Sequence, residues 1–181
     1  MDYEEKTMKS EKIYEGKILN LRIDTVELPN KKYSKREIVE HPDGVAIVPI
    51  TSNDSLILVK QYRKAIGDFM YEIPAGKLEI GEEPKEAAKR ELEEETELLA
   101  NKLTYLSEFY TSPGFCDEKI YLFLAKELIK SDGKIETEEY IETKEFPMEE
   151  LIKMINRGEI IDSKTIIGIY TAIEFLKTDK R

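Results

Sequence analysis

The stretch from Gly76 to Leu98 reads GKLEIGEEPKEAAKRELEEETEL and joins a glycine-containing loop to a glutamate-rich segment. Glu91, Glu94 and Glu95 stand at positions i, i+3 and i+4, so a helix places their side chains on one face. Carboxylates crowded in this way repel one another unless a cation neutralises them. Their oxygen atoms suit Mg²⁺, with Mn²⁺ as a substitute. Because a run of charge usually marks a solvated helix face, the metal-site interpretation depends on the surrounding residues.

The same stretch resembles the Nudix box, G-x5-E-x7-R-E-U-x-E-E-x-G-U, in which U is an aliphatic residue. Eight of the nine defined positions match at the family spacing, from Gly76 at the start to Leu98 at the end. The resemblance implies a hydrolase that cleaves diphosphate bonds with Mg²⁺ held by the box. Glu82 and Arg90, which are also box positions, are expected to brace the loop and the helix. The implied metal ligands are the carbonyl oxygen of Ala75 and the side chains of Glu91, Glu94 and Glu95.

The unmatched position is Glu97, where the family has the glycine that normally ends the helix. A left-handed backbone at a non-glycine residue costs roughly 1 kcal/mol. Two outcomes are therefore open: the helix ends at Glu97 in that conformation, or it continues for another turn. The helical angle of Glu97 points away from the expected ligand face. We therefore expect this departure from the box to affect stability more than catalysis.

Beyond the box, nearly all of the chain after Ile18 resembles the ADP-ribose pyrophosphatase branch of the Nudix family. The segment YEIPAG at 71–76 resembles the E-x-P-A-G segment that leads into the box. A proline follows Leu98 at the spacing typical of this branch, within SPG at 112–114. The segment DSKT at 162–165 resembles the start of a helix, with Asp162 as its N-cap. The substrate-binding residues implied by the resemblance are Arg36, Glu37, Arg63, Glu72, Pro113 and Gly114.

Two of these residues also have a direct physical interpretation. Arg63 follows an apolar run, and a planar guanidinium there can grip a phosphate through two hydrogen bonds. Glu72 is open between two roles, a carboxylate at the edge of the core and an outer-shell ligand of the metal.

The family also needs a carboxylate outside the box to deprotonate or orient the attacking water. The segment ETEEYIE at 136–142 offers several glutamates, and the alternative is a solvated acidic loop. Glu139 matches a position that some relatives use, so we choose it as the base, with Glu142 second. The catalytic residues implied are Glu95, Glu139 and Glu142.

Composition narrows the class of protein. The chain has 181 residues, which fits one domain with a small extension. A net charge of -10 argues against a nucleic-acid partner, although bound divalent ions would still allow an anionic substrate. The single cysteine, Cys116, excludes an internal disulfide. We find no signal peptide and no apolar run of membrane-spanning length, so we expect a cytoplasmic protein that does not enter a membrane.

Hydrophobic periodicity predicts a small sheet followed by a mixed α/β core. The run GVAIVPI at 44–50 is almost continuously apolar, as in a strand covered on both faces. Pro84 suits the first turn of a helix over 83–97. The N-terminal strands are expected at 12–17, 19–28 and 34–41, after a frayed start at 1–10. Further strands are expected at 56–62, 69–73, 103–110, 119–125 and 140–146, and further helices at 148–156 and 164–176.

These elements predict an α/β protein. The resemblance implies a Nudix-type α/β/α sandwich with a mixed sheet, and the early strands add a small N-terminal antiparallel β-sheet. We expect residues 1–42 to form an N-terminal β extension used in dimerisation, and residues 43–181 to form the hydrolase domain. Relatives in this branch are usually homodimers that exchange N-terminal strands, and an exposed sheet needs covering.

The implied function is Mg²⁺-dependent hydrolysis of the pyrophosphate bond of ADP-ribose to AMP and ribose 5-phosphate. The box determines the bond cleaved but not the groups beside it, so another nucleoside diphosphate sugar or a dinucleotide stays open as the substrate. A non-catalytic Nudix module that senses nucleotides is a second alternative, which only Glu97 favours. A third is a structural acidic domain whose glutamate helix binds a basic partner.

Overall fold

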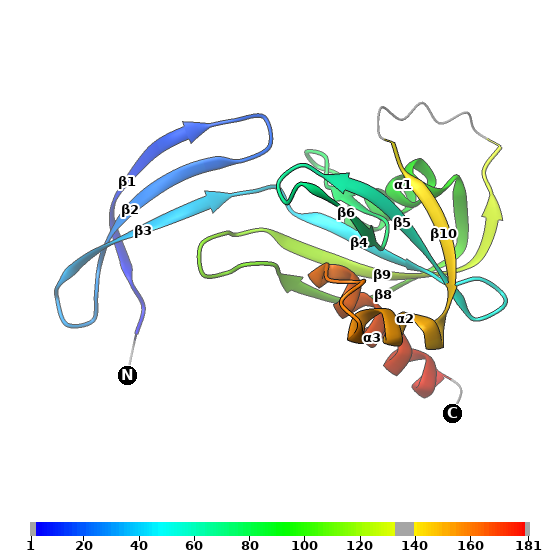
Figure 1. The fold of residues 1–181 in the computed structure, drawn as a ribbon. Coiled ribbons are helices and arrows are strands. Elements are labelled where there is room, and N and C mark those ends of the chain that lie inside the picture. The colour runs from blue at the N-terminus through cyan, green and yellow to red at the C-terminus, as the bar shows by residue number, and fades with distance from the viewer. Residues whose placement is uncertain (1–2, 133–139, 180–181) are drawn as a thin grey trace. The chain divides into compact units, whose positions relative to one another are not determined.

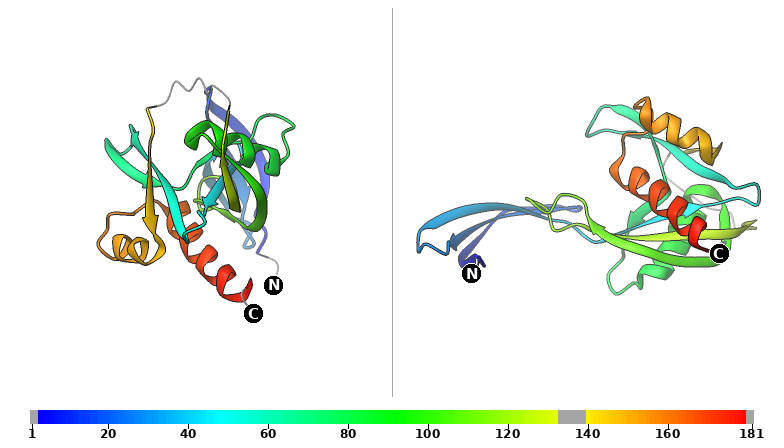
Figure 2. Two further views of the ribbon diagram at one scale, coloured as in Figure 1. Left: turned by 90° about the vertical axis from the view of Figure 1, so that its right-hand side faces the viewer. Right: turned by 90° about the horizontal axis from the view of Figure 1, so that it is seen from below.

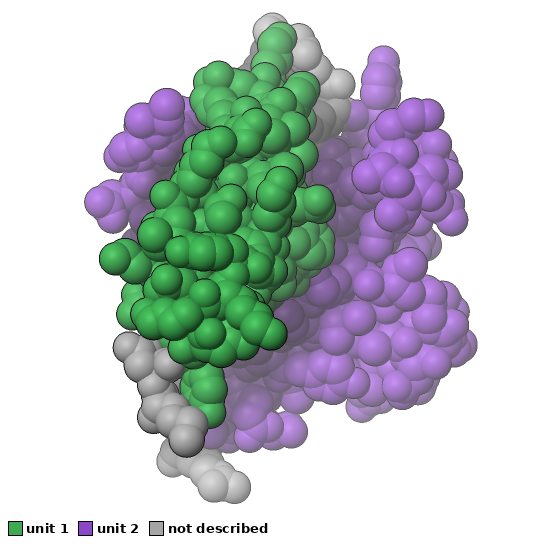
Figure 3. Space-filling model, turned by 90° about the vertical axis from the view of Figure 1, so that its left-hand side faces the viewer, with its two compact units in different colours: residues 1–43, 110–119 green, residues 44–109, 120–181 purple. Residues whose placement is uncertain are grey.

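The computed structural model describes residues 3–132 and 140–179, with the elements labelled in Figure 1. Contacts divide the chain into two compact units (Figure 3). Unit 1 comprises residues 1–43 and 110–119, and unit 2 comprises residues 44–109 and 120–181.

Unit 1 contains an antiparallel sheet of β1 (Lys6–Glu15), β2 (Asn20–Glu27) and β3 (Tyr33–Glu40), in that order. The expected small antiparallel sheet is therefore confirmed. The expectation of a frayed start over residues 1–10 is wrong, because β1 begins at Lys6, which pairs with Glu27. Every residue of β1 is exposed, so backbone pairing with β2 rather than burial of an apolar face holds the strand.

The segment 110–119 belongs to unit 1 although it is distant from the N-terminal strands in sequence. The Val39 amide donates to the Phe115 carbonyl at 2.7 Å, and the Asp117 amide donates to the Val39 carbonyl at 3.2 Å. The Asp117 carboxylate also accepts a hydrogen bond from the backbone of His41 at 2.9 Å. These bonds hold the loop that carries Pro113 and Gly114 against β3.

Unit 2 is built on a four-stranded mixed sheet in the order β7-β4-β9-β8. The strand β4 (Gly44–Pro49) runs parallel to β9 (Lys119–Lys130) and antiparallel to β7 (Ala75–Lys77). The strand β8 (Leu98–Tyr110) lies at the edge next to β9. The parallel pair in a largely antiparallel setting makes this the mixed sheet that the sequence predicts.

A second sheet in unit 2 has β5 (Ser55–Arg63) at its centre. Its antiparallel neighbours are β6 (Asp68–Glu72) on one side and β10 (Glu142–Pro147) on the other. Since β5 ends at Arg63 and β6 ends at Glu72, these two charged residues lie in the same sheet.

Helices cover both faces of the mixed sheet, as Figures 1 and 2 show. Val45 and Ile47 of β4 share a core cluster with residues of one helix, whereas Ala46 and Val48 belong to a second core cluster that contains residues of the other two. All of β4 is buried, which confirms a strand covered on both faces and an α/β/α arrangement. The first helix is α1 (Pro84–Thr96), and the other two are α2 (Met148–Asn156) and α3 (Ser163–Asp179).

The two ends of α1 follow from local sequence. Pro84 occupies the first turn, where its missing N–H leaves no bond unmade. The helix ends at Glu97, whose backbone is left-handed with φ 57° and ψ 27°. The first of the two outcomes considered for Glu97 is therefore the one adopted. The Glu97 carbonyl accepts a hydrogen bond from the Ser131 amide at 2.9 Å, which fixes this helix end beside the end of β9.

Candidate active site

One candidate site lies in unit 2, where α1 faces β7. The Ala75 amide donates to the Glu95 carboxylate at 3.0 Å, so these two expected metal ligands are in contact. One Arg90 nitrogen, Nη1, donates to Glu91 at 2.7 Å and to Glu94 at 3.1 Å. The three carboxylates of this helix face are therefore each engaged by a donor from the Nudix-like segment or the residue before it.

Gly76 allows β7 to approach this helix closely. A Cβ atom placed at Gly76 would lie 2.0 Å from the carboxyl carbon of Glu91, which is far inside van der Waals contact. Only glycine therefore leaves Glu91 its present position beside the backbone of β7. The requirement explains the first box position by space rather than by backbone conformation.

Arg90 and Glu82 brace the loop before α1, as expected. Arg90 donates to both oxygen atoms of Glu82, at 3.0 and 2.9 Å, and to the Lys77 carbonyl at 3.1 Å. Glu82 also accepts the Glu79 amide at 2.9 Å, which closes the loop. The hydrogen bonds from Arg90, followed by that amide, hold the pKa of Glu82 below its ordinary value.

The donor set beside β7 fits a hard divalent cation. Carboxylates at i, i+3 and i+4 and a nearby carbonyl oxygen are the ligand types that Mg²⁺ takes. Within residues 3–132 and 140–179, no three acidic, histidine or cysteine side chains already converge as a metal cage. Arg90 instead neutralises Glu91 and Glu94. A cation bound here would therefore compete with Arg90 for the oxygen atoms of these two carboxylates.

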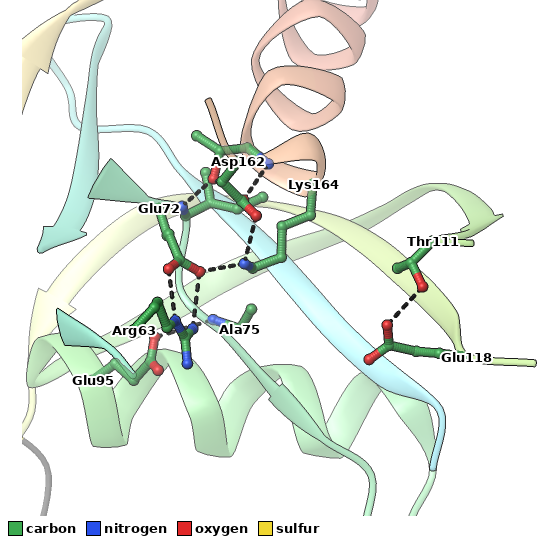
Figure 4. Close-up of polar contacts among 10 residues, drawn as sticks. Arg63, Glu72, Ala75, Glu95, Thr111, Glu118, Asp162 and Lys164 are labelled. Atoms are coloured by element: carbon green, nitrogen blue, oxygen red, sulfur yellow. Dashed lines mark hydrogen bonds and ion pairs between the residues drawn. The ribbon is translucent and has the colours of Figure 1, made fainter. Parts of the chain in front are cut away.

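A second set of contacts in unit 2 surrounds Glu72 (Figure 4). Arg63 donates to its two oxygen atoms from Nε at 2.7 Å and from Nη2 at 2.9 Å, and Lys164 forms a further ion pair with it. The side chain of Glu72 is only 2% exposed, whereas that of Arg63 is 40% exposed. Glu72 thus lies behind Arg63, which fits the core-edge interpretation. Arg63 keeps an accessible surface for an anion.

Two effects compete at the Glu72 carboxyl. Burial alone would raise its pKa, but the hydrogen bonds from Arg63 and the charge of Lys164 overcome this effect and lower the pKa. Glu72 is therefore a carboxylate at neutral pH. It is buried but compensated by two cations.

The start of α3 supplies the rest of this cluster. The Asp162 carboxylate accepts the Thr165 amide at 2.9 Å, which confirms Asp162 as the N-cap. Asp162 also lies 3.1 Å from the Lys164 ammonium. Lys164 lies within the DSKT segment, but no local pattern in the sequence predicts a role for its side chain.

The remaining predicted residues fall into two places. Glu142 is the first residue of β10, where it is exposed and opposite Lys60 of β5. Glu139 lies outside the described residues. Unit 1 brings Arg36, Glu37, Pro113 and Gly114 together around one pocket of about 480 Å³. Its other lining residues are Glu5, Arg22, Ile38, Tyr110, Phe115, Cys116 and Asp117.

Arg36 is held in this pocket by the N-terminal residues. Its Nε and Nη2 atoms donate to Glu5 at 2.8 and 2.5 Å. Cys116 is a free thiol there. The pocket was not expected from the sequence as a whole, because its residues come from segments that are distant along the chain.

Comparison with known proteins decides the family. The NUDIX domain matches residues 40–166, and the nucleoside diphosphate sugar hydrolase N-terminal domain matches residues 5–39. The chain belongs to the Nudix hydrolases. It is therefore an enzyme of the family that acts on pyrophosphate bonds, and its box is the segment Gly76 to Leu98.

Two curated relatives cover almost the whole of this Nudix hydrolase. An ADP-ribose pyrophosphatase of Bacillus subtilis (strain 168) is 48% identical over 92% of this chain and 91% of its own. A methanol dehydrogenase activator of Bacillus methanolicus is 45% identical over the same shares of the two chains, 92% and 91%.

A solved structure confirms the Nudix fold. The crystal structure of an ADP compounds hydrolase superposes with a TM-score of 0.87, at 22% identity, over 97% of this chain and 95% of that one. Among the described residues, no helix is both long and apolar enough to cross a membrane.

Proposed function

We propose that this Nudix hydrolase cleaves the pyrophosphate bond of ADP-ribose to AMP and ribose 5-phosphate, with Mg²⁺ as its cofactor. One observation carries the proposal: Arg63 is 40% exposed and is held by the buried carboxylate of Glu72. Glu72 lies only three residues before Ala75, which belongs to the carboxylate site. A fixed guanidinium beside a carboxylate site suits a diphosphate. The 48% identity to an ADP-ribose pyrophosphatase favours ADP-ribose in particular.

The residues proposed to hold the cation are Glu91, Glu94 and Glu95, with the Ala75 carbonyl. Mg²⁺ bound there would neutralise the diphosphate and lower the pKa of a coordinated water. Arg63 would hold phosphate oxygens through hydrogen bonds. Glu139, or Glu142 in its place, would accept or orient the proton of the attacking water.

The pocket in unit 1 is proposed to bind substrate through Arg36, Glu37, Pro113 and Gly114. We also propose residues 1–42 as an extension that dimerises and residues 43–181 as the hydrolase domain. A cytoplasmic location belongs to the same proposal, on the ground of the sequence pattern described above.

The first test is AMP release from ADP-ribose with about 5 mM Mg²⁺, a concentration chosen to saturate weak carboxylate sites. A reaction without metal is the control. Rapid release that depends on Mg²⁺ supports the proposal. No release from ADP-ribose under these conditions would contradict it.

A matched pair of variants tests the metal assignment. Glu94→Gln removes one proposed ligand charge and should abolish turnover while the fold is kept. Glu86→Gln removes an exposed carboxylate of the same helix, whose ion pair among the described residues is with Lys89, and should leave the rate unchanged. Near-normal activity of Glu94→Gln would refute the metal assignment.

A second candidate substrate is another nucleoside diphosphate sugar. The match of residues 5–39 to the nucleoside diphosphate sugar hydrolase N-terminal domain favours this class. A panel of such sugars and of dinucleotides, assayed for the nucleoside monophosphate product, would separate the two. If one of these compounds has a higher kcat/KM than ADP-ribose, that compound replaces ADP-ribose as the proposed substrate.

A further inference from the structure

Lys164 stands at the beginning of α3 but reaches a carboxylate in another part of unit 2. Its ammonium contacts Glu72 at the end of β6, and its side chain is only 16% exposed. The two residues are 92 positions apart in the sequence. Figure 4 shows Lys164 and Arg63 meeting the same Glu72 carboxylate.

The charges of this cluster balance. Arg63 and Lys164 supply two positive charges, and Glu72 and Asp162 supply two negative charges. Removal of Lys164 would leave two carboxylates and one guanidinium. Among the described residues, Arg63 would then be the cation left in contact with the buried carboxylate of Glu72. The added negative potential would oppose an anion at the exposed part of Arg63.

Geometry adds to the effect of charge. Both hydrogen bonds that Arg63 makes to Glu72 depend on the position of one carboxyl group. Lys164 fixes that group from α3, and Asp162 fixes Lys164 at 3.1 Å. A bidentate pair holds a guanidinium in one orientation, so its direction follows that of the carboxylate.

We infer that Lys164 is a positioning residue, which acts through Glu72 to orient Arg63 and to preserve its affinity for the diphosphate of the substrate. This inference rests on the proposed function, in which Arg63 contacts that diphosphate. It assigns to α3 a part in substrate binding that does not require α3 to touch the substrate.

The test compares three variants by steady-state kinetics of AMP release from ADP-ribose. Lys164→Met keeps much of the side-chain volume and removes the charge, so kcat/KM should fall roughly tenfold or more, mainly through KM. Lys164→Arg keeps the charge and should retain most of the wild-type kcat/KM. Lys177→Met removes an exposed lysine of the same helix and should match the wild type.

The split between KM and kcat distinguishes positioning from a merely structural role. Partial unfolding lowers the concentration of active enzyme, so the apparent kcat would fall while KM stays constant. An unchanged KM in Lys164→Met would overturn the inference. If this variant does not fold, Lys164→Gln, which keeps a donor without the charge, is measured in its place with the same expected rise in KM.

A double-mutant cycle tests whether the effect passes through Arg63. In an Arg63→Ala background, Lys164→Met should have little further effect on KM, because the group that it positions is absent. A full, additive rise in KM would contradict the inference.

Binding of inorganic pyrophosphate, measured by calorimetry, separates this inference from the proposed substrate. If the wild type releases no AMP from ADP-ribose, the proposed function fails, but the affinity for pyrophosphate still tests Lys164. Weaker binding by Lys164→Met than by Lys177→Met supports positioning, and equal binding refutes it.

Discussion

Glu97 has a side chain at a position whose left-handed backbone conformation favours glycine. It ends α1 at φ 57°, where a side chain costs roughly 1 kcal/mol relative to glycine. We predict that Glu97→Gly raises the free energy of unfolding by about this amount, less the extra entropy of an unfolded glycine. Urea denaturation measures the gain, and activity should not change because Glu97 is not among the proposed metal ligands.

Glu97→Ala is the matched control for this prediction. It keeps the left-handed strain but removes a negative charge from the C-terminal end of a helix, where that charge is unfavourable by a few tenths of a kcal/mol. The gain for Glu97→Gly should therefore exceed that for Glu97→Ala. Equal gains would show that charge, and not backbone strain, is the cost of this departure from the box.

Glu72 is a single residue that should make the stability of the folded protein depend on pH in the acid range. Its folded pKa is lowered below the ordinary value of 4.5, so the unfolded chain takes up its proton first as the pH falls. Its contribution to stability is thus complete above about pH 4.5 and is lost as the pH decreases through the lower folded pKa. Melting temperatures measured from pH 7 to pH 3 should decline less steeply in Glu72→Gln than in the wild type.

The same variant has a second expected consequence. At neutral pH, Glu72→Gln leaves Arg63 and Lys164 without their shared buried carboxylate. The loss should be smaller than the about 3–5 kcal/mol of a fully buried pair, because Arg63 is 40% exposed and Lys164 keeps its ion pair with Asp162. The wild type and the variant should therefore differ most at neutral pH and converge in acid. Parallel pH profiles would assign the acid sensitivity to other carboxylates.

The contact between β7 and α1 depends on the absence of one side chain. A Cβ at Gly76 would displace the Glu91 carboxylate, whose carbon would otherwise lie 2.0 Å away. We predict that Gly76→Ala lowers kcat/KM by about 100-fold, because a misplaced catalytic group can cost this much. Melting should change less than activity, since the displaced group is the end of a side chain.

Gly44→Ala is a useful comparison within the same sheet. Its added Cβ would meet the Ile120 side chain at 2.9 Å and the Gly76 carbonyl at 3.0 Å, without touching Glu91. The change should therefore reduce stability more than catalysis. If Gly76→Ala were to lose stability and activity in the same proportion, the specific displacement of Glu91 would be refuted.

Helices and strands with a regular residue pattern were predicted well, because residues that are close in sequence determine them. The continuous apolar run of β4 and the Pro84 start of α1 depend on neighbouring residues, so both appear in the sequence. The beginning of β1 was missed because all its residues are exposed, and its position depends on pairing with β2.

The parts of the site that could not be predicted depend on contacts that are distant in sequence. The ion pair of Lys164 with Glu72 spans 92 positions, and no local pattern specifies it. The box carboxylates could be predicted because one helix spaces them. Their engagement by Arg90 could not, because three acceptors compete for the same guanidinium.

At the scale of the whole molecule, the two units differ in how completely their strands are buried. Unit 2 packs apolar side chains on both faces of its mixed sheet, whereas β1 in unit 1 is exposed along its full length. Met8 and Ile13 of β1 are 50% and 49% exposed. Apolar side chains on an exposed edge strand are a surface on which a second chain can pair.

We therefore predict that the protein is a homodimer through β1, with a mass of twice 21.0 kDa in light scattering at micromolar concentration. The double change Met8→Lys and Ile13→Lys should shift it to the monomer, because charge then replaces apolar surface on this edge strand. The double change Glu11→Gln and Glu15→Gln alters the net charge from -10 to -8 in the same way (-10 plus 2), but should keep the dimer. A monomeric wild type would contradict the prediction outright. Both variants change the net charge by the same amount, but only the first removes apolar side chains from β1. A monomer in both variants would therefore show that charge, and not apolar surface, controls association.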